Sequence, residues 1–404
     1  MFIINGDFLS KLFVVSEYVR AETNSTGYYW SCIIDELSNS IGKLSVISPE
    51  LPDSGSENAT HLPSFAKPYN KENLVSRLFH QCLQVASLLK LILFRVKSND
   101  LVFSGTNPII LCVILPLAKS LIGFRSVILV HDLYPNNLVA ARLMRKSSWS
   151  YKILDSIFEY IYKLADHVFA IGRDMRDILV EKGVQRDKIT YMPLWVDDKH
   201  IEVLKRDDSD FLHANGIVDR VVFQFFGNLG RVQGIASLLE AISLTKSQNS
   251  AFLFFGDGRE LNLVTQFISD HPEKAVFYLG TVELENRSAV LASCDVALVT
   301  LSKNMFGLGV PSKAFFSMAA DRPILAAVSI GSELELLVAE HKIGWQCEPE
   351  DPQAMASLID SLCENDRHNL VQSPRTVLKE HFSGRESLVS MSESIKLLFV
   401  SDTA

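Results

Sequence analysis

Three glycine-containing segments in the second half of the chain have the residue types of a phosphate-binding site. They read FFGNLGRVQGI (225–235), FFGDGRE (254–260) and GLGVPSKAFFSMAADRP (307–323). Glycine lets a backbone approach a ligand closely, and the start of a helix presents free N–H groups and a positive dipole end. Two cations could add charge-assisted contacts. The segments predict a diphosphate site with the candidates Arg231, Lys313, Gly227, Asn228, Gly230, Gly256, Gly307, Gly309 and Ser312. Ordinary strand-to-helix turns remain the alternative, because the first segment lacks the G-x-G-x-x-G spacing of dinucleotide-binding proteins.

Three further places along the chain hold candidate site residues. His131 and Asp132 end the apolar run SVILVHD (126–132), and two titratable groups at the end of a strand are catalytic candidates. Thr26 and Gly27 precede an amphipathic run, although a hydroxyl there could simply cap the helix. Glu333 lies in SELE (332–335), which fits an S-x-x-E capping box, and its carboxylate could face a sugar.

Short apolar runs that alternate with amphipathic stretches must position these residues. In the first half the strand candidates are 11–16, 43–48, 100–105, 126–132, 167–172 and 188–193, and in the second half 221–227, 251–258, 275–280, 295–301 and 322–328. This alternation predicts an α/β protein with parallel sheets covered by helices. We expect two Rossmann-like domains, residues 1–200 and 201–404, with a terminal helix at 387–400 that packs back on the first. Ligands of such sheets bind at the carboxyl ends of the strands.

Composition excludes several classes of protein. The six cysteines form no C-x-x-C pair and the ten histidines no H-E-x-x-H motif, so we expect a reducing compartment and no metal site. The N-terminal residues MFIINGDFLSK lack the features of a signal peptide, which favours the cytoplasm. The apolar runs 83–94 and 109–118 are too short to span a membrane.

Basic residues are concentrated in the first half of the chain. Residues 1–200 hold 22 Lys and Arg against 20 Asp and Glu, a charge of +2, within a total of −8 that leaves −10 for the rest. Segments 71–97 and 119–152 carry five and six basic residues against one acidic residue each. Together with their apolar faces they suit peripheral docking on the anionic inner leaflet. Solvated helix faces over a core are the alternative.

The order of these motifs resembles glycosyltransferase family 4, in its bacterial O-antigen, capsule and exopolysaccharide branch. The most specific likeness lies in ADHVFAIGRDMRDIL (165–179) and in VPSKAFFSMAADRPILA (310–326). The resemblance implies a GT-B fold, with two facing Rossmann-like domains and a cleft between them. It also implies retaining transfer of a sugar from a nucleotide-sugar donor without a cofactor or metal ion.

The resemblance assigns roles to the candidates. The second domain would hold the donor, taken to be a UDP-sugar with an N-acetylated or deoxy hexose, and Arg231 and Lys313 would stabilise charge on its diphosphate. His131 and Asp132 would act in catalysis. Thr26 and Gly27 would lie on the acceptor side, facing a polyprenyl-diphosphate-linked saccharide, and no nucleic acid is expected as a partner.

One departure separates this chain from many members of the family. Where they carry two glutamates eight positions apart, this chain has Leu308 and Phe316. Two other functions stay open at this point. One is a UDP-sugar 2-epimerase, which shares the architecture, and the other is a catalytically silent subunit that supports a partner transferase.

Overall fold

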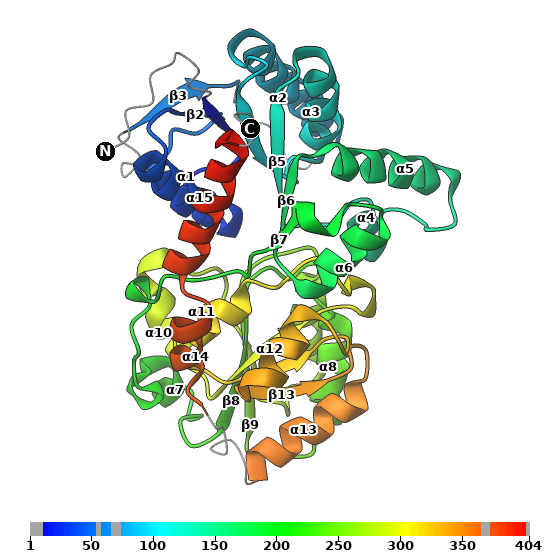
Figure 1. Ribbon diagram of the computed structural model, residues 1–404. Helices are drawn as coiled ribbons and strands as arrows, with labels where there is room; N and C mark the ends of the chain where they lie inside the picture. The colour runs from blue at the N-terminus through cyan, green and yellow to red at the C-terminus, as the bar shows by residue number, and fades with distance from the viewer. Residues whose placement is uncertain (1–10, 54–57, 66–73, 365–371, 401–404) are drawn as a thin grey trace.

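A computed structural model describes residues 11–53, 58–65, 74–364 and 372–400. Two parallel sheets form its frame (Figure 1). The first has the order β3-β2-β1-β4-β5-β6-β7. Its strands are β1 (Leu12–Val15), β2 (Leu44–Ser48), β3 (Ala59–Pro63), β4 (Leu101–Gly105), β5 (Arg125–Val130), β6 (His167–Ala170) and β7 (Ile189–Tyr191). Helices cover both faces, so both faces of the central strands are buried and their sequences are continuous apolar runs.

The helices of the first domain are α1 (Ser25–Ser40), α2 (Leu74–Arg95), α3 (Ile109–Ile122), α4 (Asn136–Ala140), α5 (Trp149–Leu164) and α6 (Arg173–Glu181). The predicted apolar runs 83–94 and 109–118 lie inside α2 and α3, which pack on one another. No described helix is long and apolar enough to cross a bilayer.

The second sheet has the order β10-β9-β8-β11-β12-β13. Its strands are β8 (Val221–Phe226), β9 (Ser250–Phe255), β10 (Val276–Tyr278), β11 (Val296–Thr300), β12 (Ile324–Ala327) and β13 (Gly344–Cys347). Neighbouring phenylalanines of β8 and β9 stack, and the Phe223 and Phe252 ring centroids lie 5.4 Å apart. The second such pair, Phe225 and Phe254, lies nearer the ends of the strands, where the candidate site is expected.

The helices of the second half are α7 (Asp210–Ala214), α8 (Ile235–Leu244), α9 (Leu261–Asp270), α10 (Arg287–Ala292), α11 (Lys313–Ala319), α12 (Glu333–His341), α13 (Pro352–Glu364), α14 (Pro374–His381) and α15 (Gly384–Val400). The chain then returns to the first domain, where α15 lies beside α1 (Figure 1). The Ser392 hydroxyl donates to the Glu36 carboxylate across this contact. The largest core cluster contains residues of both domains, so the two halves share apolar packing at their junction.

The eleven predicted strands form within a few residues of their expected positions, while the edge strands β3 and β13 were not predicted. Their sequences, ATHLP and GWQC, contain no apolar run, and no residue of either edge strand is fully buried.

Candidate functional site

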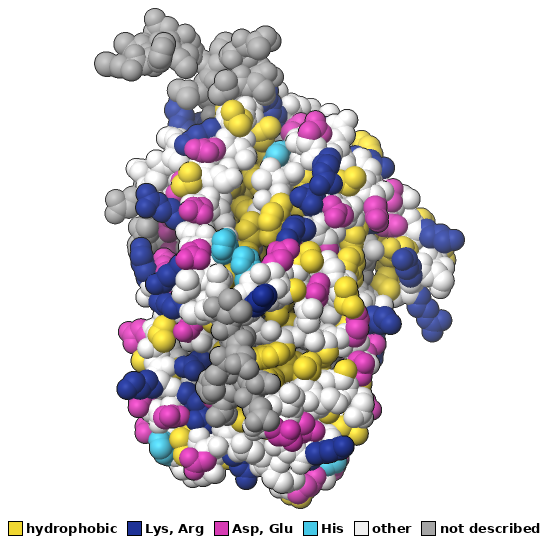
Figure 2. All heavy atoms as spheres, turned by 60° about the horizontal axis from the view of Figure 1, so that its bottom comes forward, with side chains coloured by type: hydrophobic (Ala, Val, Ile, Leu, Met, Phe, Trp, Pro, Cys, Tyr) yellow, Lys and Arg dark blue, Asp and Glu magenta, His cyan; other side chains and the backbone are white. Residues whose placement is uncertain are grey.

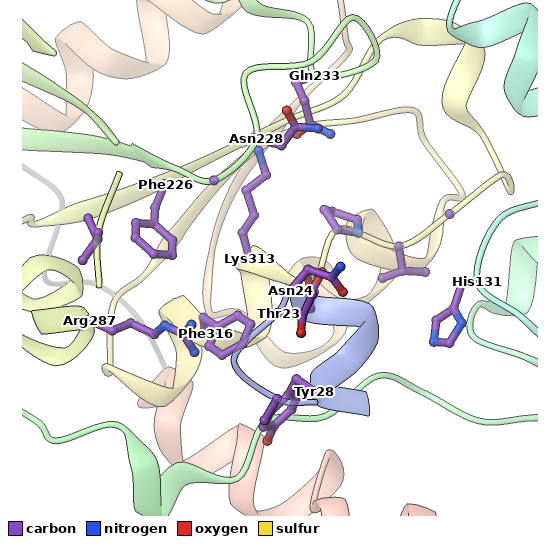
Figure 3. Close-up of a pocket in the computed structure, with 18 of the residues that line it drawn as sticks. Thr23, Asn24, Tyr28, His131, Phe226, Asn228, Gln233, Arg287, Lys313 and Phe316 are labelled. Carbon is purple, nitrogen blue, oxygen red and sulfur yellow. The ribbon is translucent and has the colours of Figure 1, made fainter. Parts of the chain in front are cut away.

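A cavity of about 870 Å³ lies between the two domains at the carboxyl ends of the strands (Figure 3). The first domain contributes residues 21–25, Tyr28 of α1, and the pair that follows β5. The second contributes the loops after β8, β10 and β11 and the start of α11. Parallel strands bring these loops together, because their carboxyl ends share one edge of each sheet.

Lys313 places a buried ammonium group in this cavity. It is the first residue of α11, and in Figure 3 its side chain extends toward Asn228. The Lys313 Nζ lies 3.7 Å from the Phe225 ring centroid, a cation–π distance, and has no hydrogen-bond partner among the described residues. Burial lowers the pKa of Lys313 to about 7. An unpaired buried amine is costly, so this site favours an anionic ligand.

His131 and Asp132 line the opposite wall, immediately after β5. Burial lowers the pKa of His131 to about 4, and its Nε2 has no partner among the described residues. Burial raises the pKa of Asp132 to about 6, although the Asn137 amide donates to its Oδ1 at 2.7 Å. The imidazole is therefore neutral at physiological pH, while Asp132 is mostly ionised.

The glycine segments divide into residues that line the cavity and residues that shape its walls. Gly227 lines it and has φ 128°, a backbone conformation that residues other than glycine rarely adopt. Gly256 supports Gly227 from behind, since a Cβ there would lie 1.9 Å from the Gly227 carbonyl oxygen. Asn228, Gly309 and Ser312 also line the cavity.

Like Gly256, four further candidates of the second domain do not line the cavity. Gly230 and Arg231 lie in the turn after β8, and the Arg231 guanidinium points toward the Ala141 carbonyl of the first domain at 3.5 Å. Gly307 lies against α6 and not on the cavity. Glu333 is 2% exposed and its carboxylate accepts from Arg173 and from the Tyr191 hydroxyl. These contacts already occupy both oxygens of Glu333, which leaves neither directed at the cavity.

The acceptor-side candidates Thr26 and Gly27 lie inside α1 and do not line the cavity. The helix is capped by Asn24, whose side-chain oxygen accepts from the Gly27 N–H at 2.9 Å, and not by the Thr26 hydroxyl. Thr23, Asn24 and Tyr28 line the cavity instead. The predicted segment reaches the cavity through the immediate neighbours of Thr26 and Gly27, since Ser25 and Tyr28 also line it.

The sequence analysis did not predict the cavity wall formed by Arg287, Phe316 and Tyr28. The Arg287 guanidinium lies 4.9 Å over the Phe316 ring, and the Tyr28 ring centroid lies 6.0 Å from that of Phe316 (Figure 3). These residues come from α10, α11 and α1, more than 250 positions apart at the extremes, so only the fold brings them together. The available signal was Phe316, which stands where many members of the resembled family carry a glutamate.

No group of three His, Cys, Asp or Glu side chains that could hold a metal ion is found among the described residues. The cations that face the cavity are Lys313 and Arg287.

Family models and a curated relative show what the chain is similar to. Residues 32–200 match the model of Glycosyltransferase Family 4, and residues 220–365 match Glycosyl transferases group 1. The chain is 41% identical over 394 residues to a Pseudomonas aeruginosa protein named probable glycosyltransferase WbjE, covering 96% of this chain and 98% of that one. The chain belongs to glycosyltransferase family 4. The prediction of a glycosyltransferase enzyme of this family is thereby confirmed.

Solved structures share the fold. Anabaena HepE matches with a TM-score of 0.70 at 15% identity, covering 96% of this chain and 99% of that chain. WaaG, a glycosyltransferase involved in lipopolysaccharide biosynthesis, matches with a TM-score of 0.68 at 12% identity, covering 95% and 99%. The predicted GT-B fold is confirmed.

Proposed function

We propose that this glycosyltransferase takes its sugar from a nucleoside diphosphate sugar bound in the interdomain cavity, with the diphosphate at Lys313. The observation that carries the proposal is the buried Lys313 ammonium, which has no partner among the described residues. A diphosphate would supply the missing counter-charge. A UDP-sugar is the donor of choice, which is supported by the crystallisation of HepE, a protein of the same fold, with UDP-glucose.

The proposed reaction is a retaining transfer in which the leaving diphosphate takes up the negative charge. The sugar–oxygen bond to the diphosphate breaks, and the acceptor hydroxyl bonds the anomeric carbon on the same face and gives up its proton to the departing oxygen. Lys313 would stabilise the charge that develops there. His131 and Asp132, on the first-domain wall, would hold and orient hydroxyl groups. No protein base and no metal ion are required by this scheme.

We further propose that the acceptor is a polyprenyl-diphosphate-linked saccharide in the synthesis of a surface polysaccharide, and that the transferred sugar is an N-acetylated or deoxy hexose. An arm of the first domain supports docking at an anionic inner membrane face. From α4 to α5 it exposes the large apolar side chains Leu143, Trp149, Ile153 and Tyr160, and Trp149 is 77% exposed. The basic residues of this arm are Arg142, Arg145, Lys146, Lys152 and Lys163, against the acidic residues Asp155 and Glu159.

Lys and Arg side chains gather on this arm at the right edge of the molecule in Figure 2. Apolar anchors beside cations are the features that bind a peripheral protein to anionic lipid. Of the two segments expected to dock, 119–152 overlaps this arm, while residues 71–73 of the other lie outside the described residues.

The test of the function is calorimetric titration of the purified protein with a panel of UDP-, GDP- and dTDP-sugars, followed by product analysis with polyprenyl-diphosphate-linked saccharides. We expect selective binding of one UDP-sugar and an elongated lipid-linked product. Lys313→Met, which keeps the apolar stem, should abolish detectable donor binding in a folded protein. Conversion of the donor without any acceptor would point to an epimerase, and the absence of turnover despite donor binding to a supporting subunit.

A further inference from the structure

Two helices from different domains begin face to face behind the cavity. In the first domain, α6 begins at Arg173 after Gly172; in the second, α12 begins at Glu333 after Ser332. Gly172 has no side chain that could cap its helix, and the Ser332 side chain forms no capping hydrogen bond. The first N–H groups of both helices therefore need acceptors from elsewhere.

Each helix receives its cap from the other. The Arg173 backbone N–H donates to the Glu333 Oε2 at 2.7 Å, and the Glu333 backbone N–H donates to the Asp174 Oδ2 at 3.2 Å. Both carboxylates are buried, with Asp174 6% and Glu333 2% exposed. The Arg173 guanidinium also donates to two carboxylates of α12, that of Glu333 at 3.0 Å and that of Glu340 at 2.8 Å. The reciprocal cap exists only while the two domains are in contact.

The same oxygen of Asp174 also holds the loop that leads to Lys313. The Gly307 backbone N–H donates to the Asp174 Oδ2 at 3.1 Å. Gly307 has φ 66° and lies so close to α6 that a Cβ there would be 2.3 Å from the Ile178 Cδ1. Two residues later Gly309 reaches the cavity surface. The donor loop of the second domain is thus fixed by a helix of the first.

We propose that Asp174 is a positioning residue for donor binding: its carboxylate joins the starts of α6 and α12 to the loop 307–313, so that the diphosphate site is assembled only when the domains are in contact. This inference rests on the proposed function of the cavity. Asp174 touches no part of the cavity surface and acts through the backbone of the loop.

The test replaces Asp174 with asparagine, which keeps the volume of the side chain. The amide presents only one acceptor oxygen, so Asp174→Asn cannot keep both the bond to the Met175 N–H at Oδ1 and the two bonds at Oδ2. We expect the Kd for the nucleotide sugar to rise about tenfold or more, because a buried N–H group loses its acceptor. The KM for the acceptor should stay within about twofold of wild type. A general loss of stability would not produce this split.

Asp177→Asn is the matched control on the same helix. The Asp177 side chain is 59% exposed and pairs with Arg176 and Arg186 of its own domain. Its donor Kd should be that of the wild type.

A folded Asp174→Asn protein with wild-type donor Kd would overturn the inference. If that variant does not fold, Glu333→Gln carries the test, since it keeps the backbone N–H that donates to Asp174 but removes the charge that caps α6. A rise in donor Kd would support the inference, and an unchanged Kd would reject it. If the wild-type protein bound no nucleotide sugar, the proposed function would fail together with this inference. If the wild-type protein and the variant bound the nucleotide sugar equally well, only the inference would be rejected.

Discussion

Raising the pH should weaken binding of the nucleotide sugar because Lys313 loses its proton in the free protein. The pKa of the free Lys313 is about 7, and a bound diphosphate favours the ammonium form, so the pKa in the complex returns toward the ordinary value of about 10.4. Lys313 carries its proton in about half of the free protein at pH 7 and in about 3% of it at pH 8.5. Affinity should therefore fall about 16-fold between these values, or about 1.6 kcal/mol.

Isothermal titration calorimetry checks this prediction in two independent ways. The Kd measured from pH 7 to 8.5 gives the dependence of affinity on pH. This range lies below the pH at which uracil is deprotonated. At pH 7, titrations in buffers of different ionisation enthalpy should show uptake of about half a proton per ligand. Lys313→Arg is the control, because arginine stays charged throughout and should bind with a Kd that does not depend on pH. A constant wild-type Kd without proton uptake would refute the argument that Lys313 meets the diphosphate.

Three further changes test other parts of the structure. Burial raises the pKa of Asp132 to about 6, so kcat/KM should fall below about pH 6, where Asp132 becomes protonated. The Asp132→Asn variant should be slow and should not show this fall at acidic pH. A variant whose kcat/KM still falls below about pH 6 would exclude Asp132 as the cause. Gly27→Ala should destabilise the protein by about 1–3 kcal/mol in urea unfolding, because the added Cβ would lie 2.1 Å from the Arg20 carbonyl oxygen. Gly42→Ala, where nothing lies within 4 Å, is its control, and equal stabilities would contradict the packing argument. Trp149→Ser should reduce flotation with anionic liposomes while leaving donor affinity unchanged, and undiminished flotation would remove the arm from the membrane contact.

The sequence predicted the sheets well because strands buried on both faces must be apolar along their whole length. The strands β3 and β13 lie at sheet edges, have no fully buried residue and therefore lack the signal. Lys313, Asn228 and His131 were predicted because each directly follows a strand or opens a helix, where the topology alone places it near the cavity.

Side-chain direction could not be predicted in the same way. Arg231 belongs to the expected loop but turns toward α4, and Glu333 opens the expected helix but is buried against α6. Both outcomes depend on contacts between domains, which no local pattern encodes. The Arg287–Phe316 contact lies within the second domain and joins α10 to α11, two helices that are separate in the sequence, so local sequence could not predict it either.

The return of α15 to the first domain limits how this enzyme can be re-engineered by recombination. A hybrid that takes everything after residue 201 from a relative would also replace the helix beside α1, and would pair a foreign α15 with the native helix. The exchange most compatible with the fold keeps the terminal helix with its original partner and crosses over twice, once before β8 and once between α14 and α15, because α14 packs on α11 of the second domain. Such a cassette would carry only the half of the cavity that the second domain contributes.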